Sequence, residues 1–321
     1  MNNPWSAIEK PSSDFNVRLV DEAHPLKLFW GVDTQRRYLF AYDAAATCLP
    51  EKKALPRLSG IELYVVPQGA RGKLVLVLQD NANWELFYAL CSDLVRATAS
   101  VKDESAAAIV IIRRLQRWQE LLRRSRPRTL SPEEIKGLMG ELLFLQTTLA
   151  VAFGYDTAVQ AWRGPEGAPQ DFATGETALE VKCQSGGAKP VVRIHSADQL
   201  CPQLPTGYLV VYTLAGEAED QPGNWSLNSV VARVRDDLAG AGVASRERFE
   251  DLLYLTGYFT CAEYDEPRFS VVAVKCYKLA DGFPRILNSG LAPGIESVSY
   301  SIRLDSCAAF QAKPEWWPAQ I

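Results

Sequence analysis

The spacing of apolar residues changes part way along the chain, and this change constrains the fold more than any other sequence feature. Residues 1–100 contain short strand-like runs separated by turns, whereas residues 104–124 repeat apolar side chains every three or four positions. Short alternating runs are typical of an antiparallel sheet, and the longer spacing is typical of a helix that buries one face. We therefore expect a β-rich N-terminal module at 1–100 and a helical, arginine-rich connector at 101–130. The predicted strands are 28–32, 38–42, 61–66 and 73–78, with helices at 83–99 and 104–124.

A strong start signal separates the C-terminal part of the chain. Ser131, Pro132 and Glu134 combine a capping serine, a first-turn proline and a glutamate three residues after the cap, so we expect a helix from here to about residue 152. The segments that follow are predicted as strands at 158–162, 178–182, 191–195, 208–214 and 269–275, with helices at 225–238 and 246–255. Strands and helices that alternate in this way predict an α/β (α+β) domain at 131–321.

Composition excludes several classes of protein. A chain of 321 residues is long for a single core, and its formal net charge of −4 argues against a histone-like basic surface. No run approaches the roughly 20 apolar residues of a membrane helix, and the N-terminus lacks the pattern of a signal peptide. Seven scattered cysteines and two histidines, with no CxxC pair, indicate neither a zinc cage nor a disulfide framework. We expect a cytoplasmic protein with reduced thiols and no membrane contact.

Positive charge is concentrated in one segment. Seven arginines stand between residues 113 and 128 against a single acid, Glu120. A helix would bring those spaced by four and seven residues onto one face. The segment is either a solvated face with a linker or a patch that binds phosphates. The candidates for nucleic-acid binding in it are Arg113, Arg117, Arg124, Arg126 and Arg128.

Polar residues line one face of the strand predicted around residue 180. Glu180, Lys182 and Gln184 share this face because side chains alternate along a strand. Asp171 lies nine residues before Glu180, and residues 173–177 can turn one strand back on the next. A hairpin would bring the Asp171 carboxylate beside Glu180 and Lys182.

Two carboxylates and a lysine in this arrangement suit the hydrolysis of a phosphodiester. Mg²⁺ takes oxygen ligands and usually keeps waters and substrate phosphate oxygens, so two carboxylates suffice to hold it. A bound metal lowers the pKa of a water and offsets negative charge in the transition state. The Lys182 ammonium can orient the attacking water or help to remove its proton.

The helix that begins after Ser131 offers a fourth candidate, Glu141, at the flank of an apolar stripe. If the helix packs across the sheet, this carboxylate reaches the same site, and Gly137 and Gly140 allow a close approach. An exposed or capping role is the alternative for Glu141. The stripe consists of Ile135, Leu138, Leu142, Leu145 and Leu149.

In their order along the chain, these residues resemble the PD-(D/E)xK nuclease superfamily. Gly140-Glu141, Gln170-Asp171-Phe172 and Leu179-Glu180-Val181-Lys182 follow the family pattern of a helical glutamate, an aspartate on one strand and (D/E)xK on the next. The family's proline before the aspartate is replaced by Gln170. The whole chain is similar to a bacterial branch named only as PD-(D/E)xK motif proteins, often found beside restriction and phage-defence genes. That branch has His-Ser and then Asp/Glu-Gln-Leu after the ExK, as residues 195–200 do here.

The resemblance implies a restriction-endonuclease-like mixed sheet flanked by helices at 131–321. It also implies a Mg²⁺-dependent DNA endonuclease of a restriction or anti-phage system, for which Mn²⁺ can substitute. The catalytic residues would be Asp171, Glu180, Lys182 and Glu141, and the three carboxylates among them would be the metal ligands. DNA, a second copy of the chain and other defence-system subunits are the expected partners.

Alternatives remain for the function and for single residues. The same fold can serve as a non-catalytic DNA-binding or assembly subunit, with the N-terminal module as its docking surface. Gln184 and His195 are further candidates for nucleic-acid binding, although a histidine at a strand end is more often structural. Ser196 is expected to cap a helix that begins near residue 197. Trp162 fits packing as well as it fits base stacking.

Overall fold

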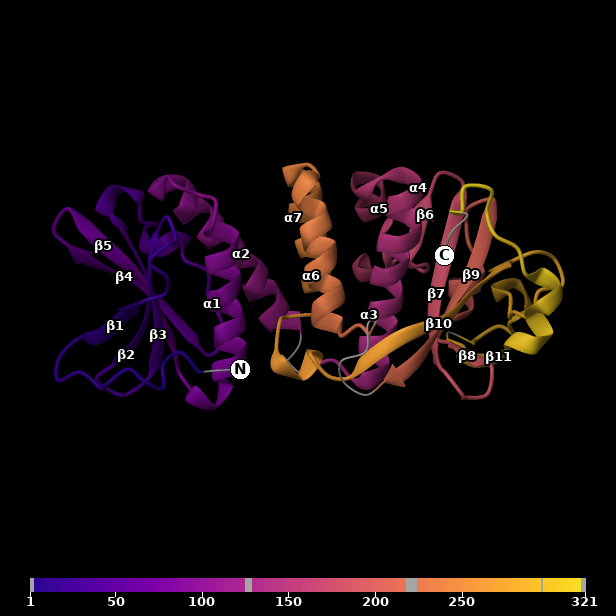
Figure 1. The fold of residues 1–321 in the computed structure, drawn as a ribbon, viewed down its shortest axis with the longest axis horizontal. Helices are drawn as coiled ribbons and strands as arrows, with labels where there is room; N and C mark the ends of the chain where they lie inside the picture. The colour runs from indigo at the N-terminus through magenta and orange to yellow at the C-terminus, as the bar shows by residue number, and fades with distance from the viewer. Residues whose placement is uncertain (1–2, 125–128, 218–223, 296, 319–321) are drawn as a thin grey trace. The chain divides into compact units, whose positions relative to one another are not determined.

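The structure is a computed structural model that describes residues 3–124, 129–217, 224–295 and 297–318 (Figure 1). The chain divides into two compact units, each with its own sheet. The first contains Met1–Arg128 with Phe259–Cys261, and the second contains Thr129–Tyr258 with Ala262–Ile321. The fold is mixed α/β, as the sequence predicts.

The first unit is an antiparallel five-stranded sheet covered by two helices. All four predicted strands and both predicted helices are present, and one further strand precedes them. An aromatic cluster joins sheet to helix, because the Trp5 ring lies 5.0 Å from the Trp30 ring and 5.3 Å from the Phe87 ring, between centroids. In sheet order the strands are β1 (Phe15–Leu19), β2 (Lys27–Asp33), β3 (Tyr38–Ala45), β5 (Arg71–Leu78) and β4 (Ile61–Gln68), followed in the chain by α1 (Trp84–Thr98) and α2 (Glu104–Arg124).

The second unit contains a mixed four-stranded sheet and a separate two-stranded ribbon. The hairpin of β6 and β7 is antiparallel, β7 pairs with β9 in parallel, and β10 lies antiparallel at the other edge. The sheet order is β10 (Arg268–Lys278), β9 (Thr206–Glu217), β7 (Thr177–Ser185) and β6 (Phe172–Thr174), and the ribbon consists of β8 (Val191–Ile194) and β11 (Tyr300–Arg303).

One long helix forms the core of the second unit. It comprises α3 (Pro132–Phe144), a π-helical turn (Leu145–Leu149) and α4 (Ala150–Phe153), and Ser131 and Glu134 form the predicted capping box. By length and composition Pro132–Phe153 is long and apolar enough to cross a membrane. Buried core helices meet the same criterion, and 61% of its most apolar window is buried inside the protein. The remaining helices are α5 (Tyr155–Ala161), α6 (Leu227–Asp237) and α7 (Val243–Leu255).

The predicted strand at 158–162 is wrong, since these residues belong to α5 and its C-terminal cap. Gly154, with φ of 81°, ends the preceding helix, and α5 begins at the next residue. A five-residue apolar run does not distinguish a short strand from a buried helical turn. Trp162 alone pairs like a strand residue, through a bridge to Phe172.

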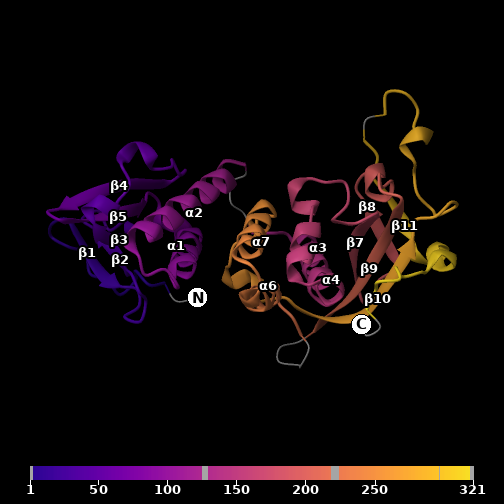
Figure 2. The ribbon, with the colours of Figure 1, turned by 90° about the horizontal axis from the view of Figure 1, so that it is seen from above.

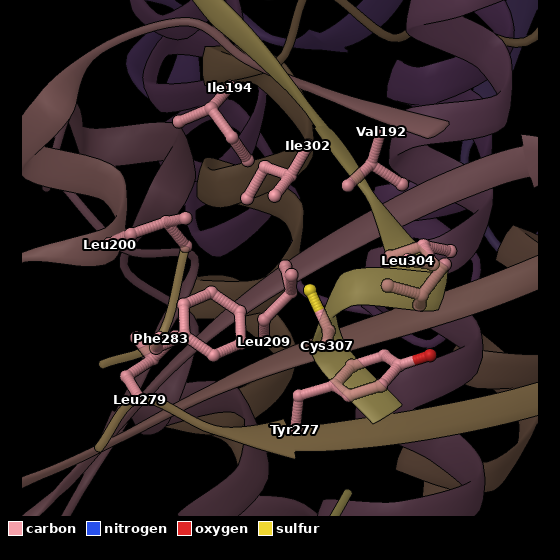
Figure 3. Close-up of a cluster of buried hydrophobic side chains, with 11 residues drawn as sticks. Val192, Ile194, Leu200, Leu209, Tyr277, Leu279, Phe283, Ile302, Leu304 and Cys307 are labelled. Carbon is pink, nitrogen blue, oxygen red and sulfur yellow. The ribbon is translucent and has the colours of Figure 1, made fainter. Parts of the chain in front are cut away.

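The main sheet of the second unit is covered on both faces. Figures 1 and 2 show α3 on one side of β7 and the β8–β11 ribbon on the other. Apolar side chains of the ribbon pack on β9, at positions that the register places beside Glu180 and Lys182 (Figure 3). On the polar face of β7, Glu180 is therefore fully buried, and Lys182 and Gln184 are half-buried. The ribbon contributes Val192, Ile194 and Ile302 to a buried cluster that also contains Leu209 and Val211 of β9.

Gly140 sets the distance between α3 and the sheet. A Cβ atom at this position would overlap the Sγ atom of Cys183 on β7. The same expectation for Gly137 is wrong, because an added Cβ there would meet nothing within 4 Å. The close approach therefore depends on one of the two glycines.

We expect Gly140→Ala to destabilise the protein by about 1–3 kcal/mol, because the methyl group overpacks the contact between α3 and β7. Gly137→Ala is the matched control and should stabilise the helix by about 0.5–1 kcal/mol. Urea unfolding of both variants measures these changes. The penalty should shrink when Cys183→Ala is added to Gly140→Ala, and an undiminished penalty would contradict this explanation.

Candidate active site

The β6–β7 hairpin places Asp171 opposite Glu180, as the sequence predicts. Phe172 pairs with Leu179, so Asp171 stands one residue before the pairing begins. Its Oδ2 atom accepts a hydrogen bond from the Val181 backbone N–H at 2.7 Å. Its own carbonyl accepts from the N–H groups of Arg163 at 2.8 Å and Gly164 at 2.9 Å. Backbone contacts therefore hold Asp171 on both sides.

Glu180 is fully buried, with 0% of its surface exposed. The Lys182 Nζ atom lies 2.6 Å from Oε1 of Glu180. Among the described residues, no group donates a hydrogen bond to Oε2. Leu179 and Val181, on the opposite face of the strand, are buried in the core as predicted. The strand thus carries one charged pair into the interior.

Glu141 reaches the same site from α3. Its Oε2 atom accepts a hydrogen bond from Nε1 of Trp162 at 2.7 Å. Trp162 is fully buried, and its N–H requires an acceptor at this depth. The charges of Asp171 and Lys182 both act on Glu141. All five residues of the predicted apolar stripe are buried, which explains why the flank of the helix faces the sheet.

Burial and mutual repulsion shift the carboxyl groups toward their protonated forms. Burial first, and then the charge of Asp171, raise the pKa of Glu141 to about 8. The same two causes raise the pKa of Glu180 well above its usual value. Burial also raises the pKa of Asp171, against the opposing effects of Lys182 and the Val181 N–H. Neutral carboxyls relieve the repulsion when no cation is bound.

Lys182 remains an ammonium in this environment. Burial alone would lower its pKa, but Glu180 and Asp171 more than offset this effect, and the pKa is raised above its usual value. A lysine with a raised pKa is a donor of hydrogen bonds and positive charge. Because Lys182 already carries its proton, it does not act as a general base.

The donor set fits a hard divalent cation. Each carboxylate has a protein donor or cation beside one oxygen: Val181 N–H for Asp171, Trp162 for Glu141 and Lys182 for Glu180. Three carboxylates face a single ammonium, so a second positive charge would improve the balance. Within the described ranges, no three His, Cys, Asp or Glu side chains are already arranged as a metal cage. Two carboxylates with water and phosphate oxygens are the usual Mg²⁺ environment.

Gln184 and His195 lie in different surroundings. Gln184 turns inward, where its Nε2 donates to Oγ1 of Thr213 at 2.9 Å. His195 is exposed just after β8, and its pKa is lowered by partial burial and by the charges of Lys182 and Arg193. His195 is therefore the more exposed of the two.

Residues 195–200 form a turn that is tied to the segment before Asp171. Gln199 accepts the His195 N–H through Oε1 at 2.8 Å, and Gln170 donates through Nε2 to the Asp198 carbonyl at 2.6 Å. Ser196 makes no side-chain capping bond, and Ala197–Leu200 is a short 3-10 turn, so the capping role expected for Ser196 is wrong. The turn thus gives Gln170 a structural role at the position of the family's proline.

Sequence reasoning missed the roles of Trp162 and Gln170. Both bonds join residues more than 20 positions apart in the chain, so local periodicity carries no signal for them. The requirement of a buried tryptophan N–H for an acceptor was the one available clue. It does not identify which acceptor is used.

The arginine run lies on and after α2, in the first unit. Arg113 is exposed and Arg117 is half-buried on this helix. The side chain of Arg124, together with Arg126, Arg128 and the side chain of Glu120, lies outside the described residues. A role for the run in binding nucleic acid stays a prediction.

A helical glutamate, an aspartate beside one strand and ExK on the next strand of a mixed sheet define a nuclease-like fold of the PD-(D/E)xK type. A family model described as "Putative PD-(D/E)XK family member (DUF4420)" matches residues 1–305. The chain belongs to this family. The match spans both units, so the N-terminal unit is part of the family pattern. No curated protein and no solved structure matches the chain.

The raised pKa of Glu141 predicts a stability that depends on pH. In the absence of divalent cations, the folded state holds a proton on Glu141 up to pH of about 8, whereas the unfolded chain releases it near 4.5. Stability should therefore fall as pH rises between these values, with this carboxyl contributing up to about 1.4 kcal/mol per pH unit. Urea unfolding at several pH values measures the slope.

Glu141→Gln should flatten this decline, because the amide does not titrate and can still accept from Trp162. The exposed residue Glu263 provides the control variant Glu263→Gln, which should retain the wild-type slope. Equal slopes in the wild type and Glu141→Gln would show that Glu141 does not hold a proton in the folded protein.

Proposed function

We propose that the protein is a Mg²⁺-dependent DNA endonuclease, with Asp171, Glu180, Lys182 and Glu141 as its catalytic residues. The observation that supports it most is the buried Glu180 carboxylate, which has Lys182 at one oxygen and no donor to the other among the described residues. Removal of an ionised carboxylate from water costs several kcal/mol unless charge compensates it. A bound cation would supply the missing compensation.

In this proposal the carboxylates hold the cation and the lysine acts on the substrate. Asp171 and Glu180 would hold Mg²⁺ between adjacent strands, with Glu141 as a third ligand and Mn²⁺ as a substitute. The cation supplies Lewis-acid stabilisation of the phosphate that is being cleaved. Lys182, as an ammonium, orients the attacking water and stabilises negative charge in the transition state.

Three structural contacts would keep the ligands in place. Val181 N–H holds Asp171, the Trp162 indole holds Glu141, and the hairpin register keeps Glu180 opposite Asp171. None of them depends on a flexible surface side chain. A site of this kind is preorganised, which lowers the reorganisation needed when the transition state forms.

We further propose that the protein is cytoplasmic and works in a restriction or anti-phage system. The support is the resemblance to the bacterial branch found beside such genes. One site hydrolyses one strand, so double-strand cleavage would require a second copy of the chain or another nuclease subunit. A non-catalytic DNA-binding or assembly subunit is the alternative function.

Purified protein should nick supercoiled plasmid DNA with Mg²⁺ or Mn²⁺ and not with EDTA. Lys182→Ala should lower the rate by about 100-fold or more, because it removes a preorganised positive charge at the site. Lys275→Ala, at an exposed position on β10, is the matched control and should retain the wild-type rate. DNA binding without cleavage by the wild type under either metal would contradict the nuclease and support the assembly subunit.

We expect Gly164→Ala to disturb the candidate site by displacing Asp171. A Cβ atom at Gly164 would lie 2.9 Å from Oδ1 and 3.2 Å from the Cα atom of Asp171. The variant should displace this carboxylate and lower plasmid cleavage by about 100-fold, since a shift of about 1 Å at a site has effects of this size. It should also lose the rise in melting temperature that Mg²⁺ gives the wild type.

Gly240→Ala controls for the substitution itself, because an added Cβ there meets nothing within 4 Å. This variant should behave as wild type in both measurements. Normal stabilisation by Mg²⁺ and normal cleavage in the Gly164→Ala variant would show that Asp171 is not part of the metal site.

A further inference from the structure

A site that contains three carboxylates needs positive charge nearby to attract a phosphodiester. In their ionised forms Asp171, Glu180 and Glu141 repel phosphate, and the chain as a whole is acidic. The arginine run belongs to the first unit, so a cationic surface attached to the site itself has to lie in the second unit. The β8–β11 ribbon provides one.

The ribbon has one buried face and one exposed face. Val192, Ile194 and Ile302 are buried against β9 and β10 (Figure 3), whereas Val191 is 37% exposed. The opposite face exposes Arg193 of β8 together with Ser301 and Arg303 of β11, and Arg193 pairs with Ser301 in the register. The two strands read Val-Val-Arg-Ile and Tyr-Ser-Ile-Arg, with no acidic residue. This face is cationic in a chain of net charge −4.

Both arginines are available to a ligand. Arg193 is exposed, and its Nε atom donates to Oγ of Ser299 at 3.2 Å, which orients the guanidinium. The Arg303 side chain is 75% exposed, and its ion pair with Asp305 is 3.7 Å long between groups that are both largely in water. Such an exposed pair is weak, so phosphate can displace Asp305.

Hydrogen bonds connect the end of the ribbon to the catalytic hairpin. His195 follows β8 directly, and its N–H is accepted by Gln199. Gln170, which precedes Asp171, donates to the carbonyl of Asp198 at 2.6 Å, in the same turn. The charges that act on the His195 ring are those of Lys182 and Arg193, one from the site and one from the ribbon. Lys182 of the site and Arg193 of the ribbon are therefore both near enough to act on His195.

We propose that the exposed face of the β8–β11 ribbon binds the sugar-phosphate backbone of DNA beside the scissile phosphate, with His195 nearest Lys182 and with Arg193 and Arg303 farther out. The inference rests on the proposed nuclease function. It places the DNA that flanks the scissile phosphate along the β8–β11 ribbon of the second unit. Arginine donors and an exposed hydroxyl are typical groups for phosphate contacts, which position a duplex without reading its sequence. The contacts offset the repulsion by the carboxylates.

The test measures DNA binding separately from cleavage. In the Glu180→Gln background without divalent cations, anisotropy of a short labelled DNA duplex gives the binding constant at several salt concentrations. Arg193→Ala with Arg303→Ala should weaken binding and reduce the slope of log K against log salt by about 1.8, or about 0.9 for each lost phosphate contact. Arg246→Ala, at an exposed position on α7, is the matched control and should leave the slope unchanged.

A second readout uses the protein with its site intact. On plasmid DNA with Mg²⁺, the double arginine variant should raise KM severalfold while kcat changes less, because the ribbon binds flanking DNA and not the reacting atoms. Arg117→Ala in the first unit tests the competing surface in the same assays.

The outcomes separate the two proposals. A reduced slope in the double variant together with no cleavage by the wild type would sustain the ribbon contact and overturn the nuclease. Cleavage by the wild type with an unchanged slope and KM in the double variant would overturn the ribbon contact and leave the nuclease intact. If Arg117→Ala reduces the slope and the double arginine variant does not, this result would also overturn the ribbon contact and place the DNA contact in the first unit.

Discussion

The buried pair of Glu180 and Lys182 is the interaction on which the second unit depends. A carboxylate with no exposed surface is stable only with compensating charge, and Lys182 at 2.6 Å supplies one unit of it. Burial raises the pKa values of all three acids, and the charge of Asp171 raises those of Glu141 and Glu180 further. The fold therefore keeps three acidic groups beside a single lysine, and a divalent cation would balance their charge.

Packing on both sides of β7 maintains this imbalance. On one side, Gly140 lets α3 approach Cys183, which brings Glu141 to the site and within reach of the Trp162 indole. On the other side, the apolar face of the β8–β11 ribbon covers the sheet positions beside Glu180 and Lys182. Glu180 is buried between these two layers, while the Lys182 side chain keeps 14% of its surface exposed, so the structural core and the candidate site are built from the same contacts.

Much of the site is predictable because its geometry is local. Asp171, Glu180 and Lys182 belong to one hairpin, so alternation along a strand and a short turn suffice to place them together. Glu141 follows from the apolar stripe that determines which side of α3 is buried. The partners of these groups are not predictable in this way. Trp162, Gln170 and the ribbon strand β11 come from distant parts of the chain, and residues 158–162 are too few for periodicity to distinguish a helix from a strand.

The sequence by itself determined the class of fold, the capped helix after Ser131, the strands of the two main sheets and the ribbon apart from β1, β6 and β11, and the order of the four polar residues. These features depend on periodicity, turn residues and caps, which act over a few positions. The tertiary structure decided that Glu180 is fully buried, that Trp162 holds Glu141, and that the β8–β11 ribbon packs on β9. Burial and charge balance depend on which distant segments pack together, and that information is not contained in local patterns.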